Sequence, residues 1–122
     1  MPADKVLLIE DDQSMLALLR TLLRFEGFEV THLESEEELD EILGFIREEN
    51  PALILLDVHL HQLNGFDLLH SIRKDQDMKN IRILMYSGID FRSRCMAEGA
   101  DGFILKPFMP EELILKIRKT LG

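Results

Sequence analysis

The chain has 122 residues, of which 46% are hydrophobic and 30% charged, and this composition excludes a disordered or fibrous protein. Its formal net charge of −9 argues against direct binding to nucleic acid or to an anionic membrane surface, because like charges repel. The longest apolar runs are too short to span a membrane, and the first residues lack the features of a signal peptide. A single cysteine, Cys95, cannot form an internal disulfide, which fits a reducing cytoplasm. We expect one domain over residues 1–122, with no output domain in this chain.

The chain opens with a predicted strand and a predicted helix. An apolar run over residues 5–9 predicts a buried strand that ends on three acids, residues 10–12. Residues 14–25 have helical spacing, and Gly27 is placed to end that helix. The apolar stripe expected on this helix consists of Met15, Leu18, Leu19, Leu22 and Leu23.

Residues 28–33 alternate apolar and polar side chains, as a strand with one wet face or at a sheet edge does. Ser35 and Glu38 have the spacing of a capping box, which predicts Ser35 as the N-cap of a second helix. That helix should end at Asn50, because Pro51 follows. Its expected apolar stripe consists of Leu39, Ile42, Leu43 and Ile46.

The most informative stretch lies within residues 51–60, where five apolar residues in a row end on Asp57. Turn signals on both sides predict a short strand buried on both faces, as in a parallel sheet. A carboxylate at the carboxyl end of such a strand lies where open α/β sheets bind ligands. The alternative is that Asp57 only caps the following turn.

The second half of the chain continues the alternation. In chain order it predicts a helix over residues 66–74, a strand over 81–86, a short helix over about 90–98, a strand over 102–105 and a helix from Pro110 with Leu113, Ile114, Ile117 and Leu121 buried. Five βα units predict an α/β fold with a five-stranded parallel sheet, helices on both faces and right-handed crossovers. Because only residues 28–33 alternate clearly, we place that strand at an edge. The strand order 2-1-3-4-5, one of the two common doubly wound orders, satisfies this position and is the order we expect.

Five polar residues follow these strands and should meet on one rim of the sheet. Three carboxylates close together repel one another unless a cation lies among them, and oxygen ligands with room for water favour Mg²⁺. A metal ion, an ammonium and a hydroxyl around one aspartate suit a transferring phosphoryl group, with that aspartate as nucleophile. Taken singly, each residue has an ordinary structural explanation, but their coincidence on one rim argues against it. The five are Glu10, Asp11, Asp57, Ser87 and Lys106.

The sequence also resembles the receiver domain of two-component response regulators, which has a flavodoxin-like (βα)5 fold. The resemblance covers essentially the whole chain, and its segments are individually weak but jointly very specific. They are residues 8–12, residues 55–58 with Gly65 downstream, residues 86–88 and residues 99–108.

The resemblance implies a phosphoacceptor module of a phosphorelay rather than an enzyme that turns over an external substrate. Asp57 would take a phosphoryl group from a sensor histidine kinase or a phosphotransfer protein, and the domain would hydrolyse its own aspartyl phosphate. Asp11, Asp57 and the backbone carbonyl of His59 would bind Mg²⁺ directly, and Glu10 would act mostly through metal-bound water. Asp12 is not expected to be a ligand.

The resemblance also implies a switch. Ser87 would turn toward the phosphoryl group, Lys106 would contact it, and Phe103 would move inward behind Ser87. The Lys106–Pro107 peptide bond is expected to be cis. These changes would act on the face of the fourth helix, fifth strand and fifth helix, and so control an output domain or a downstream protein. A phosphorylation-dependent homodimer is a further possibility.

Three positions depart from the family pattern. His61 stands where a proline is common, and Phe103 replaces a frequent tyrosine. The segment from Ser87 to Lys106 is about one helical turn short, which predicts a truncated fourth helix and leaves the carry-over of the output surface open.

Several alternatives remain at this point. His59 and His61 could bind zinc, although no other His or Cys lies close in the pattern, and His59 could instead line the mouth of the site and affect how water reaches the phosphoryl group. The chain could be an interaction module that is never phosphorylated. An aspartate-dependent phosphohydrolase would need a second aspartate at the position of His59, and a flavodoxin-like cofactor carrier would need hydroxyls and glycines in place of residues 10–12.

Overall fold

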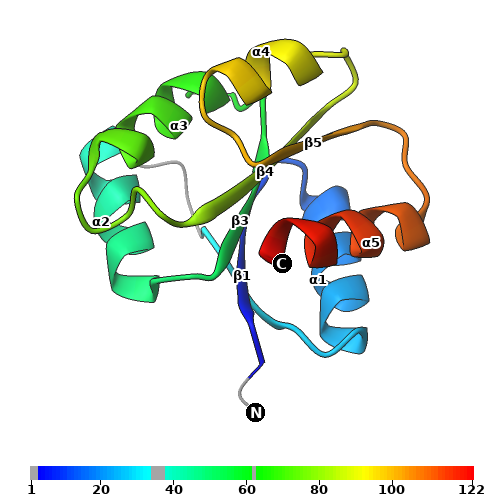
Figure 1. Cartoon of the computed structure of the whole chain (residues 1–122). Helices are drawn as coiled ribbons and strands as arrows, with labels where there is room; N and C mark the ends of the chain where they lie inside the picture. The colour runs from blue at the N-terminus through cyan, green and yellow to red at the C-terminus, as the bar shows by residue number, and fades with distance from the viewer. Residues whose placement is uncertain (1–2, 34–37, 62) are drawn as a thin grey trace.

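The computed structural model describes residues 3–33, 38–61 and 63–122 (Figure 1). The strands are β1 (Lys5–Ile9), β2 (Glu29–His32), β3 (Leu53–Asp57), β4 (Arg82–Ser87) and β5 (Gly102–Leu105). The helices are α1 (Gln13–Phe25), α2 (Leu39–Glu49), α3 (Gly65–Lys74), α4 (Arg92–Ala97) and α5 (Pro110–Leu121).

The sheet is parallel throughout, with the order β2-β1-β3-β4-β5, so the predicted topology is confirmed. The edge strand β2 has no fully buried residue, whereas all five residues of β3 are buried. The register pairs Ile9 with Leu56, Asp57 with Tyr86, and Ser87 with Leu105. The carboxyl ends of four strands therefore lie side by side, and β1 and β3 are neighbours at the point where the strand order reverses.

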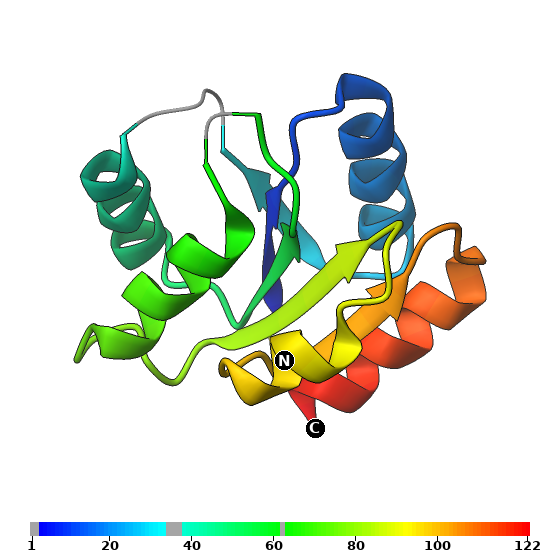
Figure 2. The same ribbon diagram turned by 90° about the horizontal axis from the view of Figure 1, so that it is seen from above.

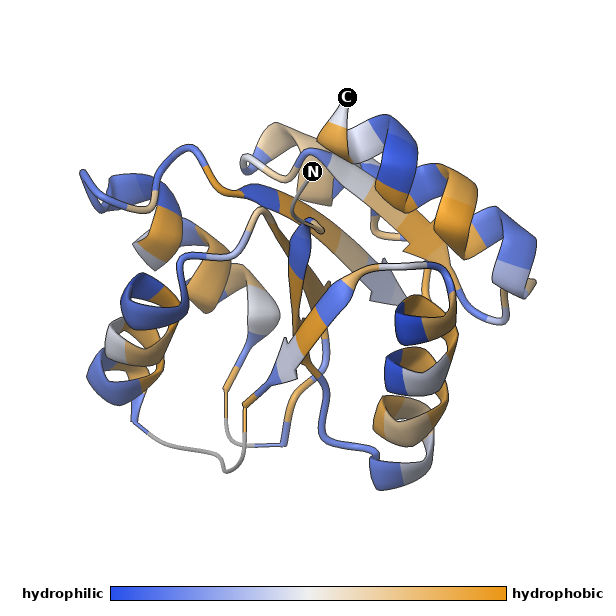
Figure 3. Ribbon diagram, turned by 90° about the horizontal axis from the view of Figure 1, so that it is seen from below, coloured by the Kyte–Doolittle hydropathy of each residue, from blue (hydrophilic) through white to orange (hydrophobic). Residues whose placement is uncertain are grey.

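Two apolar layers cover the sheet, one on each face. Helices α2, α3 and α4 pack against one face, and α1 and α5 pack against the other (Figure 2). Figure 3 shows that the helices turn their apolar sides toward the strands and their polar sides outward. Side chains alternate across the central strands, so that Leu7 and Ile54 belong to the first layer and Leu8 and Leu55 to the second.

The buried stripe of α1 differs from the predicted one. Leu18 was expected in the core but is 60% exposed, whereas Leu16, which was not included, is buried with Leu19 and Leu23. Spacings of three and four residues place Leu16, Leu19 and Leu23 on one side of the helix, and Leu18 lies more than about a third of a turn from the middle of that side. The error arose because the run of leucines permits two overlapping stripes, and only contact with the sheet decides between them.

The start of α2 also differs from expectation. Its N-cap is Glu38, which makes no side-chain capping hydrogen bond, so the helix begins later than a capping box on Ser35 would require. Ser35 itself lies outside the described residues. Asn50 ends the helix in the left-handed conformation, as expected from the Asn-Pro sequence.

The fourth helix is short, as the sequence predicted, and consists of only six residues. Contacts with α3 fix it in place. Glu98 accepts a hydrogen bond from Arg94 at 2.5 Å and lies 2.5 Å from Nε2 of His70 on α3, while the Arg94 guanidinium lies 3.8 Å above the Phe66 ring. The hydrogen bond from Arg94, and then the contact with His70, hold the pKa of the Glu98 carboxyl below its usual value.

Arg73, at the end of α3, joins the amino ends of β4 and β5. Its guanidinium donates hydrogen bonds to the carbonyls of Gly99 at 2.8 Å and Ile81 at 2.7 Å, and to the Asp101 carboxylate at 2.8 Å. Asp101 also accepts the backbone N–H of Ile83 at 2.8 Å. One half-buried cation thus ties three elements together at this end of the sheet.

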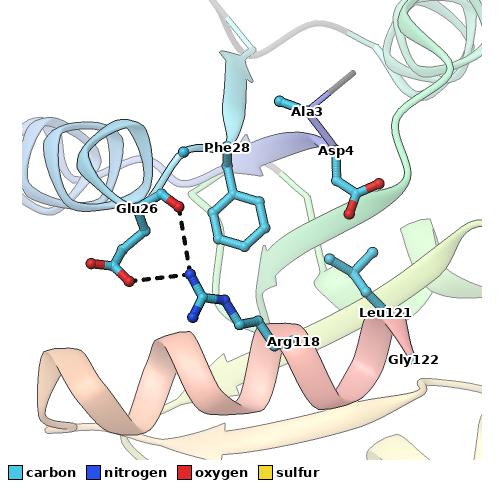
Figure 4. A pocket seen from close by; sticks show the side chains of 8 residues that line it. Ala3, Asp4, Glu26, Phe28, Arg118, Leu121 and Gly122 are labelled. Atoms are coloured by element: carbon cyan, nitrogen blue, oxygen red, sulfur yellow. Dashed lines mark hydrogen bonds and ion pairs between the residues drawn. The ribbon is translucent and has the colours of Figure 1, made fainter. Parts of the chain in front are cut away.

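A hollow of about 440 Å³ lies near the two ends of the described chain, beside the amino end of β1 (Figure 4). Its lining includes Phe28 and the ion pair between Arg118 and Glu26, whose closest side-chain atoms are 3.3 Å apart. It is thus far from the predicted acids. No helix among the described residues combines the length and the apolar character needed to cross a membrane.

Candidate functional site at the carboxyl edge of the sheet

Glu10 follows β1 and is buried. The Tyr86 hydroxyl donates a hydrogen bond to its Oε1 at 2.7 Å, and the Asp12 N–H donates to its Oε2 at 3.1 Å. Burial raises the pKa of Glu10, and the negative charge of Asp57 adds to the rise, while the two hydrogen bonds oppose it. This carboxylate is therefore held close to a second acid at a cost in free energy.

Asp57 is the last residue of β3, and only 5% of its surface is exposed. Its Oδ1 accepts the backbone N–H of His59 at 3.0 Å, and its Oδ2 lies 3.3 Å from the Lys106 ammonium. That ammonium also lies 3.9 Å from Oε1 of Glu10 and 4.7 Å from the centre of the Tyr86 ring. Lys106 thus bridges the carboxylates of β1 and β3, as the predicted convergence required.

Asp11 is half-buried and points to the loop after β3. Its Oδ2 accepts a hydrogen bond from the backbone N–H of His61, and the Nδ1 atom of His61 lies 3.7 Å from the same oxygen. A proline at position 61 would have no N–H to donate. The departure at His61 therefore changes how Asp11 is held. The next acid, Asp12, caps α1 by accepting the N–H groups of Ser14 and Met15.

Ser87 and Phe103 are both buried, and they lie on the neighbouring strands β4 and β5. The Ser87 hydroxyl accepts the N–H of Ile89 at 3.1 Å, and the Ser87 carbonyl accepts the N–H of Lys106 at 2.8 Å. The Phe103 ring already lies inside the protein with 1% of its surface exposed, so its movement stays a prediction about another state. The peptide bond between Lys106 and Pro107 is cis, as predicted.

The loop after Asp57 depends on a close approach of two backbone segments. A Cβ atom on Gly65 would lie 2.6 Å from the Asp57 carbonyl oxygen and 3.0 Å from the Val58 carbonyl oxygen. The N–H of Gly65 donates to that Val58 carbonyl at 3.0 Å, and Asn64 caps α3 through a hydrogen bond from Phe66 at 2.7 Å. Only glycine fits here, and it brings the start of α3 directly beneath the aspartate.

The three acids do not form a preassembled metal centre. Within residues 3–33, 38–61 and 63–122, no group of three or more His, Cys, Asp or Glu residues is arranged so that it could hold a metal ion. The predicted Mg²⁺ site needs fewer than three such side chains as direct ligands. Two of its direct ligands are carboxylates, Asp11 and Asp57, and the third is the backbone carbonyl of His59. The same finding gives no support to the zinc alternative at His59 and His61. The His59 ring packs 5.7 Å from the Phe91 ring.

Tyr86 is a site residue to which the sequence analysis assigned no role. Burial and the negative charge of Glu10 hold the pKa of its hydroxyl far above the usual range, so it remains a hydrogen-bond donor. A signal was present, because Tyr86 directly precedes Ser87 at the end of a buried strand, where a tyrosine hydroxyl needs a polar partner.

The fold and the site define a doubly wound α/β protein with a buried aspartate and a lysine at the switch point of its sheet. The model of the response regulator receiver domain matches residues 6–118. The chain therefore belongs to the response regulator receiver domain family, and it is a receiver domain of the two-component response regulators, which are signalling proteins.

Individual relatives agree with this membership. The probable transcriptional regulator ycf27 of Porphyridium aerugineum is 33% identical over 121 residues, which are 99% of this chain and 49% of that protein. The chain spans about half the length of the curated relatives it matches. The chemotaxis protein CheY4 of Vibrio cholerae has a TM-score of 0.85 and 26% identity, with 97% of this chain and 98% of that chain covered.

One further structure shares the fold and carries a metal ion. The receiver domain of the sensor histidine kinase PA1611 from Pseudomonas aeruginosa PAO1 has a TM-score of 0.84 and 21% identity, with 98% of each chain covered. That protein has a magnesium ion coordinated in its active site cleft.

Proposed function

We propose that Asp57 is the phosphoacceptor of this receiver domain. The observation that carries the proposal is the position of the Lys106 ammonium, 3.3 Å from the buried Asp57 carboxylate at the switch point of the sheet. A transferring phosphoryl group carries negative charge on three oxygens, and a fixed cation beside the acceptor stabilises that charge as it develops.

In the proposed reaction, an Asp57 carboxylate oxygen attacks the phosphorus atom of a phosphohistidine on a kinase or phosphotransfer protein. The new O–P bond forms as the P–N bond breaks, and the electron pair of that bond returns to the imidazole, which then takes up a proton. Lys106 contacts one phosphoryl oxygen, and the Ser87 hydroxyl gives up its contact with Ile89 to donate to another. Water later hydrolyses the aspartyl phosphate and restores Asp57.

The donor set on the rim fits Mg²⁺. Three carboxylates and one ammonium leave two formal negative charges at Glu10, Asp11, Asp57 and Lys106. Burial raises the pKa of Glu10, and the charge of Asp57 adds to the rise. Oxygen donors and few direct ligands suit a small hard cation. Asp11, Asp57 and the His59 carbonyl would hold the ion, with Glu10 acting through its water. When bound, it would supply positive charge for the phosphoryl oxygens.

The switch is proposed to reach the face formed by α4, β5 and α5. Ser87 and Phe103 lie on the neighbouring strands β4 and β5, and the Arg92 guanidinium of α4 lies 5.7 Å from the Phe103 ring. A new bond to Ser87 changes the packing behind this ring, and the change reaches α4 through Arg92. The face would then control an output domain or a downstream protein, or form a phosphorylation-dependent homodimer.

The remaining expectations belong to the same proposal. A cytoplasmic location is supported by the single cysteine, which is buried and free. The domain would hydrolyse only its own phosphoryl group, because a phosphohydrolase of the aspartate type needs an acid at the position of the exposed His59. The DNA-binding response regulator MtrA is a relative, but the charge of −9 leads us to propose that this chain itself does not bind nucleic acid.

Phosphorylation with acetyl phosphate and Mg²⁺ tests the proposal. Intact-mass spectrometry should show one added phosphoryl group on the wild-type chain and none on Asp57→Asn, and a chelator should prevent the addition. Asp67→Asn, which changes an exposed acid on α3, is the matched control and should be labelled like the wild type. Labelling that persists in Asp57→Asn would contradict the assignment.

A further inference from the structure

Tyr86 contacts two charged groups of the site through two different parts of its side chain. Its hydroxyl donates to Oε1 of Glu10 at 2.7 Å, and the Lys106 ammonium lies above its ring, 4.7 Å from the ring centre. Tyr86 is fully buried, and it pairs with Asp57 in the register of β3 and β4. The three residues before it on β4, residues 83–85, are apolar, so the hydroxyl at position 86 adds a group that packing alone does not require.

Both oxygens of the Glu10 carboxylate accept a fixed donor. Oε2 accepts the backbone N–H of Asp12 at 3.1 Å, and Oε1 accepts the Tyr86 hydroxyl. Only 2% of the Glu10 side chain is exposed, so water has little access to replace either donor. The Lys106 ammonium lies 3.9 Å from Oε1, which is beyond the range of a hydrogen bond. The hydroxyl therefore occupies the oxygen that the ammonium would otherwise bind.

Lys106 lies between two carboxylates and is closer to one of them. Its ammonium is 3.3 Å from Oδ2 of Asp57, against 3.9 Å from Oε1 of Glu10. Without the Tyr86 hydroxyl, Oε1 would be a buried carboxylate oxygen with no donor in hydrogen-bond range among these contacts, which is costly in free energy. A shift of the ammonium toward Glu10 would relieve that cost and lengthen its distance to Asp57.

The Tyr86 ring supports the ammonium from a second direction. A cation within about 6 Å of a ring centre is attracted to the face of the ring. The ring is itself held by Phe108, which meets it edge-to-face with 6.3 Å between centroids and an interplanar angle of 89°. Lysine has a long flexible side chain, so a fixed ring beneath its ammonium restricts where that charge can lie.

From these contacts we propose that Tyr86 is a positioning residue for phosphoryl transfer, in which the hydroxyl holds Glu10, the ring supports Lys106, and both keep the ammonium beside Asp57. The inference rests on the proposed function, because it takes Asp57 as the phosphoacceptor. Tyr86 does not touch the phosphoryl group and acts through its two neighbours. Since charge develops next to Asp57 during transfer, a small displacement of the ammonium should slow the reaction.

The rate of labelling by acetyl phosphate with Mg²⁺ tests the role of the hydroxyl. Tyr86→Phe keeps the ring, and we expect the rate, measured by intact mass over time, to fall by about tenfold. In the Glu10→Gln background the same substitution should change the rate by less than about twofold, because a neutral amide does not draw the ammonium away. Tyr86→Leu, which also removes the ring, should be slower than Tyr86→Phe.

A second measurement needs no phosphoryl transfer. Tyr86 is the only tyrosine in a chain without tryptophan, so near-UV absorption at wavelengths longer than the phenylalanine bands reports on this ring. A hydrogen bond to a charged acceptor is stronger than one to a neutral acceptor, and a stronger bond moves the absorption of a phenol to longer wavelength. In metal-free protein, Glu10→Gln should therefore shift the band to shorter wavelength, whereas the exposed control Glu111→Gln should not.

Met85→Leu is the matched control for the labelling rates. It changes a buried side chain of the same strand in the opposite apolar layer, and it should be labelled within about twofold of the wild-type rate. A wild-type rate in Tyr86→Phe, an equal loss in both backgrounds, or an unshifted band in Glu10→Gln would overturn the inference. If the wild type itself is not labelled, the proposed function fails, and the band shift judges the contact between Tyr86 and Glu10 by itself.

Discussion

The acidic rim and the basic hollow lie in different parts of the same sheet and differ in how deeply their charged side chains are buried. The acidic rim consists of Glu10, Asp11, Asp57 and Lys106. The basic hollow is a hollow of about 530 Å³ whose lining includes the cations Arg82, Arg92, Lys116 and Lys119. The rim lies at the carboxyl ends of β1, β3 and β5, where Glu10 and Asp57 are buried. The basic hollow includes the first residues of β4 and β5, and its arginines are more than half exposed.

This difference in burial determines how strongly each region responds to a change of charge. Buried like charges cost free energy until a cation or a covalent change relieves them, so the rim is suited to a tightly defined reaction. Exposed charges remain solvated and interact weakly one by one, so a change of charge in the hollow should have little effect at the rim. The following predictions compare the two regions, from the largest expected effect to the smallest.

Replacement of the cation on the rim should have the largest effect. Lys106→Met removes the ammonium beside Asp57, and we expect the rate of labelling by acetyl phosphate to fall by about 100-fold, a typical loss for one fixed group that stabilises charge in a transition state. The rate is measured by intact mass over time. Lys119→Met in the basic hollow is the control and should change the rate by less than about twofold. Similar losses in both variants would mean that only net charge matters.

The close backbone approach beneath the rim should be sensitive to one methyl group. Gly65→Ala places a Cβ atom 2.6 Å from the Asp57 carbonyl oxygen, and we expect the free energy of unfolding to fall by about 1–3 kcal/mol in urea denaturation. Gly44→Ala, in the interior of α2 with no atom within 4 Å of the added group, should instead gain about 0.5–1 kcal/mol. A stable Gly65→Ala protein would show that the loop can move away from Asp57.

The pH dependence of stability should distinguish buried from exposed acids. Since the pKa of Glu10 is raised in the folded state, the folded chain binds its proton more tightly than the unfolded chain does. Its contribution is therefore most favourable below the usual value of 4.5 and is lost as pH rises through the folded pKa. With a chelator present, the Tm of the wild type should fall relative to that of Glu10→Gln over this rise in pH.

The exposed residue Glu111 on α5 provides the control for this titration. Glu111→Gln should follow the wild type at each pH, since its side chain is exposed at the start of the helix. If Glu10→Gln also follows the wild type, burial and the charge of Asp57 do not raise the pKa of Glu10 in the folded chain, and the prediction is wrong.

The smallest expected effect concerns the loop above Asp11. His61→Pro removes the N–H that donates to Asp11, so this carboxylate becomes available to a cation, and the Kd for Mg²⁺ should fall by about threefold, or about 0.7 kcal/mol. His61→Ala keeps the N–H and is the matched control, so its Kd should stay close to that of the wild type. Tryptophan is absent from the chain, and calorimetry is therefore the suitable measurement. An equal change in both variants would assign the effect to the imidazole.

The sequence was sufficient for the features that depend on short-range patterns. The apolar run before Asp57 and the alternation in residues 28–33 placed a central and an edge strand, and the common order that satisfies both brought Glu10, Asp57 and Lys106 together. Pro110 was correctly placed at the start of α5 because its fixed φ suits a first helical turn.

Features that depend on helix rotation and on contacts between distant segments were not predictable in this way. The choice between Leu16 and Leu18 depends on how α1 rolls on the sheet. The hydrogen bond from Tyr86 to Glu10 joins residues 76 positions apart, and no local pattern specifies it. The basic hollow joins residues of β4, α4 and α5, and it becomes visible only when these elements are placed side by side.

The hydrogen bonds of Arg73 determine which end of the β4–α4–β5 segment can move. They clamp the carbonyl of Gly99, where the chain leaves α4 with φ +113°, while the opposite end of the segment begins at Ser87 beside the acids. We therefore expect a displacement that starts at Ser87 to swing α4 about a pivot at Gly99 instead of sliding the helix along the sheet. Amide hydrogens next to the pivot, such as those of Ile83 and Asp101, should consequently exchange with solvent more slowly than those at the Ser87 end.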